Sequence, residues 1–219
     1  MRKGEWAQIL AGALVLFVVI VFGFVIKGEW GMVLRGAVFA VLIIGVHVFS
    51  KKWAAGLLDC DVEHKIWGVY RYGFKAHWHF KKEAPFGVIV PLLMLFFSVV
   101  FLWPAGIIIK FMGILTYEAR VLKRRAARRF GPYSYTELTE WHNGLIGVVG
   151  IVGLMFLAVI AYFVGYGDLS RLAAYYMFWN MLPVSNLDGT QIFFGNRILW
   201  MVLSIVTLLF VAYALVIPV

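Results

Sequence analysis

Three uncharged apolar runs constrain this chain more than any other feature of its sequence. They cover residues 6–26, 144–167 and 198–219, and about 20 apolar residues suffice for a helix to cross a bilayer. Two further runs carry one charge each: 31–50 contains Arg35, close enough to its end to reach the interface, and 172–196 contains Asp188. With 63% hydrophobic and only 14% charged residues, the chain is predicted to be an all-α polytopic protein of the cell membrane.

The positive charges are concentrated between these runs, which predicts the orientation of the chain. One cluster lies within residues 51–82 and a second, "RVLKRRAARR", within residues 120–129. By the positive-inside rule both clusters and the N-terminus are expected in the cytoplasm. The net charge of +9 therefore indicates contact with an anionic membrane face, not with nucleic acid. For residues 120–129 we predict binding to anionic lipids, with an acidic cytoplasmic partner as the alternative.

Residues 85–117 are apolar except for Lys110 and lie between the two segments expected in the cytoplasm. A single crossing would put those segments on opposite sides, so we predict a re-entrant hairpin that is broken at Pro91 and at the "WPAG" turn of residues 103–106. A sixth full span is the alternative, and the total is about five or six transmembrane helices. The predicted organisation is an N-terminal helix (1–28), a membrane core (29–196) and a C-terminal helix (197–219). Within the core we expect a cytoplasmic loop (51–83), the hairpin (85–117) and a basic segment (118–143).

Two polar residues are predicted at matching depth in the membrane. His47 lies near the inner end of the second span and Asp188 toward the inner end of the fourth, and both spans run from outside to inside. Ionisable groups at such depth are costly unless they are paired, so both are functional candidates. Glycines recur at every third position from Gly144 to Gly153, which predicts that the third span packs closely between the second and fourth.

The sequence "NMLPVSNLDG" resembles the Asn-x-x-Pro-x-x-x-Leu-Asp-Gly signature of the site-2 protease family of intramembrane zinc metalloproteases. The matching residues are Asn180, Pro183, Leu187, Asp188 and Gly189. The resemblance extends over most of the chain, through "WHNGLIGVVGIVG", "VHVFSKKWAAGLLDCDVEHKIW" and the hairpin. It implies a helical membrane core in which the aspartate and two histidines of a His-Glu-x-x-His motif hold zinc, and in which the glutamate activates water.

At the place of His-Glu-x-x-His this chain has His47, Val48, Phe49, Ser50 and Lys51. Valine cannot accept a proton, and a lysine ammonium repels a dication. We therefore expect no catalytic residue and no metal in this former metal site of His47, Lys51 and Asp188, with zinc held by His47 and Asp188 as the alternative. Because Lys51 is four residues after His47, both project from one helix face, and we predict that Lys51 pairs with Asp188 in place of the metal. The alternative is that Lys51 extends to the cytoplasmic surface.

These observations favour a catalytically inactive, site-2-protease-like membrane protein. It would bind transmembrane segments or serve as a subunit of a membrane complex. An active intramembrane zinc metalloprotease with unusual ligands is one alternative, and it would need a loop residue to complete the metal site. A small channel or transporter built on the same core is another. The single cysteine, Cys60, excludes a cysteine-based metal cluster.

Overall fold

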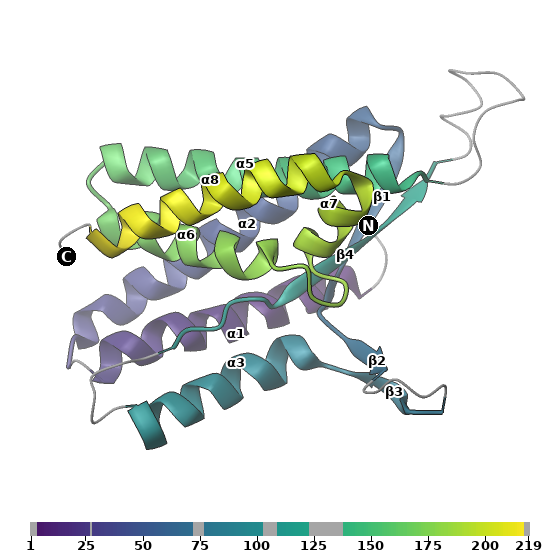
Figure 1. Cartoon of the computed structure of the whole chain (residues 1–219). Coiled ribbons are helices and arrows are strands. Elements are labelled where there is room, and N and C mark those ends of the chain that lie inside the picture. Colours follow the sequence, from purple (N-terminus) through teal and green to yellow (C-terminus); the bar gives the residue numbers. More distant parts are fainter. Residues whose placement is uncertain (1–3, 27, 72–76, 103–108, 123–137, 217–219) are drawn as a thin grey trace, which may run out of the picture.

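The computed structural model describes residues 4–26, 28–71, 77–102, 109–122 and 138–216, and most of these residues are helical (Figure 1). The long helices are α1 (Glu5–Ile26), α2 (Val33–Leu57), α5 (Glu140–Phe163) and α8 (Arg197–Val216). A short helical turn, η1 (Trp30–Met32), leads directly into α2. By length and composition these four helices, with η1 counted as part of α2, can cross a membrane, so the chain is a helical membrane protein.

The long helices lie side by side with α6 (Gly167–Met181), and α3 (Phe86–Phe97) lies next to α1 (Figure 1). Figure 1 also shows that α2 and α6 run in the same direction, as predicted for the second and fourth spans. Both end near the short helix α7 (Asp188–Gly195). Most of the buried apolar side chains between the helices belong to one large core, and two smaller clusters lie beside the strands and the hairpin.

The glycines of α5 allow this helix to pack between α2 and α7, which confirms the prediction. A Cβ atom at Gly144 would lie 3.2 Å from the carbonyl oxygen of Gln191 in α7. A Cβ atom at Gly150 would lie 2.7 Å from Cε of Lys51, and one at Gly153 would collide with Ser50, both in α2. Helix α5 is thus in close contact with α2, which carries His47, and with α7, which carries Asp188.

The prediction of one continuous span over residues 172–196 is wrong. Helix α6 ends at Met181 and α7 begins at Asp188. The break follows from Pro183, which disfavours helical geometry at the preceding residue; Leu182 is extended, with φ −64° and ψ 134°. The 15 residues of α6 extend over roughly 22 Å, less than the ~30 Å hydrocarbon core. Among the described residues, four helices are long enough to span, where about five or six were predicted.

Residues 86–102 lead away from one end of the bundle and residues 109–114 lead back to it, as the two limbs of a hairpin do (Figure 1). The outgoing limb is α3 followed by a π-helical turn, η2 (Ser98–Leu102), and the returning limb, residues 109–114, has no regular secondary structure. At the far end the N–H of Ile109 donates to Oγ of Ser98 at 3.0 Å. At the near end Trp67 joins the limbs, since its N–H donates to the carbonyl of Ile114 and its carbonyl accepts from Gly87, both at 2.8 Å.

The predicted hairpin was expected to be broken at two places, Pro91 and the "WPAG" turn, and the structure describes only the first. Pro91 does not break the helix, because α3 continues through it. Its missing N–H costs the helix only the bond to the carbonyl of Gly87, which lies in the first turn of α3. The "WPAG" turn of residues 103–106 lies outside the described residues.

The fold is not all-α as predicted, because the structure also contains two small antiparallel sheets. β1 (Cys60–Ile66) pairs with β4 (Leu115–Val121), from Cys60 opposite Val121 to Ile66 opposite Leu115, and β2 (Val69–Arg71) pairs with β3 (His79–Ala84). The predicted cytoplasmic loop 51–83 therefore contains strands and begins later than expected, because α2 continues to Leu57. Lys51 lies inside this helix and not in the loop.

Candidate functional site

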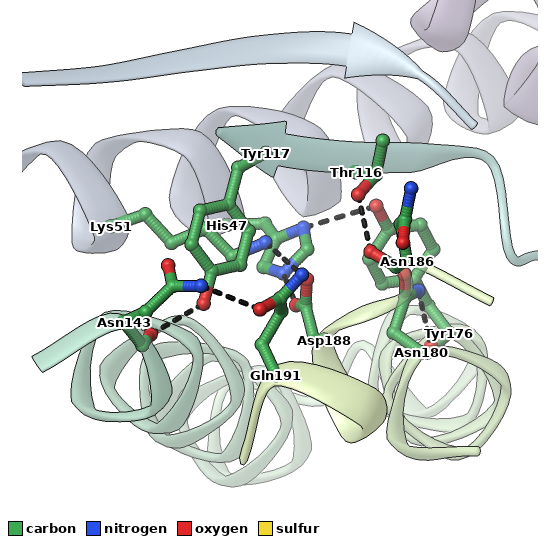
Figure 2. Close-up of polar contacts among 10 residues, drawn as sticks. All are labelled: His47, Lys51, Thr116, Tyr117, Asn143, Tyr176, Asn180, Asn186, Asp188 and Gln191. Carbon is green, nitrogen blue, oxygen red and sulfur yellow. Dashed lines mark hydrogen bonds and ion pairs between the residues drawn. The ribbon is translucent and has the colours of Figure 1, made fainter. Parts of the chain in front are cut away.

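The carboxylate of Asp188 is bound by two cationic or polar side chains of α2 (Figure 2). Nζ of Lys51 donates to Oδ1 at 2.7 Å, and Nε2 of His47 is 2.7 Å from Oδ2. All three residues are completely buried. The predicted pairing of Lys51 with Asp188 is therefore confirmed, and the alternative, a Lys51 that extends to the surface, is wrong.

The position of Asp188 is fixed by the residues of its own motif. Pro183 ends α6, and buried Leu187 precedes the first residue of α7, which is Asp188. A carboxylate in the first turn of a helix is stabilised by the helix dipole. Gly189 packs directly against the end of α6, where a Cβ atom would collide with the carbonyl of Met181. Only a glycine allows the two helix ends to approach this closely.

Asn180 and Tyr176, from the last turns of α6, extend the polar site. The hydroxyl of Tyr176 is 3.1 Å from Nδ1 of His47, and the side-chain amide of Asn180 donates to the carbonyl of Tyr176 at 2.8 Å. If His47 donates from Nε2 to the carboxylate, its Nδ1 accepts from the tyrosine hydroxyl. This tautomer follows from the hydrogen-bond network. His47 is then held at both ring nitrogens, and α2, α6 and α7 are joined through one imidazole.

A second group of residues covers the site from the side of the β1–β4 sheet (Figure 2). The ammonium of Lys51 lies 4.4 Å from the centroid of the Tyr117 ring, a cation–π contact. The hydroxyl of Tyr117 donates to the carbonyl of Asn143 at 2.6 Å, and the Asn143 amide donates to Oε1 of Gln191 at 2.5 Å. Thr116 donates to the carbonyl of Asn186. Strand β4 is thus connected to α5, α7 and the α6–α7 loop.

Sequence reasoning missed these covering residues. Asn143 and Gln191 carry the one available signal, because they are polar side chains at the edges of apolar segments. Thr116 and Tyr117 carry none, since an alternating pattern in "LTYEARV" predicts a strand but not which site it covers. They are brought to Asp188 by the pairing of β4 with β1, two segments that are far apart in the sequence.

The residues that the resemblance assigns to zinc do not fit the ion in this arrangement. Two ligands of one tetrahedral zinc ion are separated by about 3.4 Å, given bond lengths near 2.1 Å. Here Nε2 of His47 and Oδ2 of Asp188 are in direct contact at 2.7 Å, and the Lys51 ammonium holds the other oxygen. Val48 is buried in the apolar core. Within the described ranges, no group of three or more His, Cys, Asp or Glu side chains is placed to hold a metal ion.

A second polar cluster joins the start of α1 to the sheet. Oε1 of the buried Glu5 binds the ammonium of Lys52 at 2.7 Å, and Nδ1 and the backbone N–H of His64 at 3.3 Å each. Burial, together with the positive charge of nearby Lys51, lowers the pKa of His64 to about 2. His64 is therefore a neutral side chain that donates to Glu5. This cluster was not predicted, because Glu5 appears in the sequence as an ordinary residue flanking a span.

The basic segment predicted to bind lipid is described only at its beginning. Arg120 is exposed, belongs to β4, and lies 3.3 Å from Glu118. Residues 123–129 are outside the described residues. Comparisons of the chain with family models, with curated proteins and with solved structures found no match.

Proposed function

We propose that this chain is a catalytically inactive, site-2-protease-like protein of the cell membrane that binds a segment of another membrane protein, either as a client or as a subunit of a complex. The observation that carries the proposal is the buried contact of Lys51 with Asp188. A residue that would be a metal ligand in an active protease is here the partner of an ammonium group. The site then holds helices together and performs no chemistry.

Among the described residues, the site has no general base at the position where the motif places one. The position of the general base is occupied by Val48, whose side chain cannot take a proton. Both oxygens of Asp188 already accept hydrogen bonds, from Lys51 and from His47. A zinc ion would have to displace the lysine and separate two groups that are in contact. The alternative of an active metalloprotease therefore requires a rearrangement of α2 against α7.

Within the described residues no backbone hydrogen bond reaches the outer edge of β4, and this open edge supports the binding of a partner. The N–H of Leu122 donates to the carbonyl of Asp59 at 3.0 Å, so even-numbered residues of β4 point their backbone groups toward β1. By the alternation of an antiparallel ladder, the backbone groups of Tyr117, Ala119 and Val121 then point to the opposite edge. An unpaired edge is a template for an added strand, so an extended partner segment could pair there, beside the buried site.

The distribution of charge supports the proposed orientation. Arg71, Lys81, Lys82 and Arg120 are exposed on the strands at one end of the bundle. With this end in the cytoplasm, the N-terminus is also cytoplasmic and the basic segment of residues 120–129 meets anionic lipid headgroups. A partner that adds to β4 would then be bound close to the inner membrane surface.

Zinc analysis combined with site-specific crosslinking tests the proposal. A photoreactive amino acid is placed at Ala119, on the free edge, and in a control at Asp61, an exposed residue of β1. After purification in mild detergent we expect little zinc, and crosslinks to a second membrane protein from position 119 but not from position 61. Near-stoichiometric zinc that is lost in Asp188→Ala, together with cleavage of a transmembrane substrate, would establish the protease alternative. Equal crosslinking from both positions would contradict binding at the β4 edge.

A further inference from the structure

The β2–β3 sheet stands apart from the helix bundle. Figure 1 shows it beyond the start of α3, on the side of the bundle away from α5 and α8. Among the described residues its two strands pair only with each other, and every residue of both strands is at least partly exposed. An isolated two-stranded sheet is marginally stable in water and needs a further surface to pack on. A contact outside the chain is therefore expected for this sheet.

The sheet is held at the point where α3 enters the membrane. Strand β3 ends at Ala84, and α3 begins two residues later at Phe86. The ring of Phe80 lies 6.5 Å from that of Phe86, which ties the strand to the first turn of α3. The exposed side chains of α3 are apolar from Ile89 to Phe97. Contact with hydrocarbon thus begins within one helical turn of the start of α3.

The lysines of β3 are within reach of the lipid headgroups. Lys82 precedes Phe86 by four residues, so it is at most about 13 Å along the strand from the start of α3. The headgroup layer and the long lysine side chain together bridge such a distance. Lys81 is adjacent, and both lysines are exposed. Their ammonium groups can therefore meet the phosphates of the nearest leaflet.

Positive charge predominates on this sheet. Arg71, Lys81 and Lys82 are exposed, and within the described strands they are accompanied by one carboxylate, that of Glu83. Neither lysine forms an ion pair with another described residue. Ammonium groups beside a bilayer attract anionic headgroups, and salt screens this attraction beyond about one Debye length. The charge of the sheet is thus complementary to an anionic membrane surface.

The exposed aromatic side chains of the sheet favour the same surface. Tyr70 and Trp78 are exposed, and the ring of Tyr70 stacks on that of His79 with 5.0 Å between the centroids. Tyrosine and tryptophan are enriched where a membrane meets water. Nucleic acid or an acidic protein would also be attracted by the lysines, but the bilayer is always beside the sheet, because α3 continues directly from it.

We propose that the β2–β3 sheet binds the headgroups of anionic phospholipids, with its lysines on the phosphates and its exposed aromatic rings among the headgroups. This lipid site is additional to the basic segment of residues 120–129. The β2–β3 sheet is separate from the sheet that contains β4, so the lipid site does not depend on the partner proposed above.

Photolabelling with two lipid probes tests this assignment on the full chain in phosphatidylcholine proteoliposomes. Phosphatidylglycerol and phosphatidylcholine carry the same photoreactive group close to the headgroup, and each is added in turn as a minor component. We expect phosphatidylglycerol to label residues 77–84 more strongly, by up to roughly fivefold for each lysine, and the preference to disappear in high salt. Equal labelling by the two probes would overturn the proposal. Both probes occupy both leaflets, so the result is independent of the orientation of the chain.

Two double variants of equal net charge separate a local site from general attraction. Lys81→Gln with Lys82→Gln removes two charges from the β2–β3 sheet and should abolish most of the preference at residues 77–84. Lys65→Gln with Arg120→Gln removes two charges from the β1–β4 sheet, where both side chains bind Glu118, and should leave the preference unchanged. An equal loss in both variants would mean that net charge alone attracts the lipid, which would overturn the proposal.

A photoreactive amino acid at position 82 identifies the occupant in native membranes. We expect adducts whose added mass is that of an anionic phospholipid. Adducts with zwitterionic lipid, with a second protein or with nucleic acid in their place would overturn the proposal. The zinc content and the crosslinks from position 119 are measured separately, so failure of the lipid site and failure of the proposed function are distinguishable.

Discussion

Nζ of Lys51 lies 2.7 Å from Oδ1 of Asp188, although the two residues are 137 positions apart in the sequence. Both side chains are completely buried, and each comes from an element that packs against α5. Their contact fixes α7 against α2 in a region where Gly150 leaves room for the lysine side chain. Several measurable consequences depend on this pair and its surroundings.

Replacing one member of the pair should destabilise the protein more than replacing both. Lys51→Met leaves a buried carboxylate without its counter-ion, and Asp188→Asn leaves a buried ammonium; breaking such a pair typically costs about 3–5 kcal/mol. The double variant leaves neither charge and should recover part of the loss. Thermal unfolding in detergent measures all three. The control is Lys65→Met, which removes a partly exposed pair with Glu118 and should cost less than about 1 kcal/mol. Unchanged stability in both single variants would contradict the role of the pair.

Gly189→Ala should prevent the normal packing of α7 against the end of α6. The added methyl group would collide with the carbonyl of Met181, and this backbone group cannot move without disturbing the helix end. We expect a large loss of folded protein, visible as a lower unfolding temperature and early elution as aggregate. Gly45→Ala serves as the matched control, because its Cβ atom would meet nothing within 4 Å. This control should be neutral or more stable by up to about 1 kcal/mol. Equal behaviour of the two variants would argue against the close approach.

Restoring the two missing motif residues should restore affinity for zinc. Val48→Glu with Lys51→His removes the ammonium and supplies the second imidazole four residues after His47, on the same helix face. We expect zinc in the double variant, measured by elemental analysis of purified protein, and little in the wild type. Adding Asp188→Asn to the double variant should remove the zinc again. Zinc content independent of Asp188 would show that the metal binds elsewhere. Peptidase activity is not expected from these changes alone.

Stability should decrease as the pH falls below about 6.5, in part because of His64. Its folded-state pKa is lowered to about 2 from the ordinary value of 6.5. Between these two pH values His64 binds a proton in the unfolded chain but not in the folded protein. The loss is up to about 1.4 kcal/mol for each pH unit. The groups facing His64 are Glu5, whose charge is offset by Lys52, and the residues of the ionic site on α2 and α7.

The unfolding temperature of His64→Asn, measured between pH 7.5 and 5, isolates this contribution. Asparagine retains a donor for Glu5 but does not titrate in this range, so its pH dependence should be flatter than that of the wild type. His79→Asn, at an exposed position, should retain the wild-type slope. A slope that is the same in all three proteins would mean that His64 is not held neutral.

Accessibility labelling should place both ends of the hairpin on the cytoplasmic side. In a background with Cys60 replaced, single cysteines at Lys81 and Arg125 should react with an impermeant reagent only after the membrane is opened. A cysteine at Tyr166, which is half exposed between α5 and α6, should react from the outside. If positions 81 and 125 react from opposite sides, the segment of residues 85–117 crosses the membrane.

Much of the buried site could be predicted because its residues are recognisable from their immediate neighbours in the sequence. The spacing of His47 and Lys51 places them on one helix face, and the charge of Asp188 in an apolar segment requires a partner. The glycines of α5 predicted its close packing for the same reason. The break at residues 182–187 has a local signal in Pro183, but the apolar character of the segment outweighed it. The cover formed by Thr116 and Tyr117 had no local signal, because it depends on strand pairing between distant segments.

The attachment of α1 to β1 limits how the β1–β4 sheet can grow. The outward N–H groups of His64 and Ile66 are bound by the side chains of Glu5 and Gln8 at 3.3 and 3.2 Å, so this edge is closed to an incoming strand. Within the described part of the chain, addition is left to β4. A sheet with one open edge can accept a single strand, or pair with a second copy about a two-fold axis, but it has no second edge from which to propagate. Filament formation through this sheet is therefore blocked by two side chains of a membrane helix.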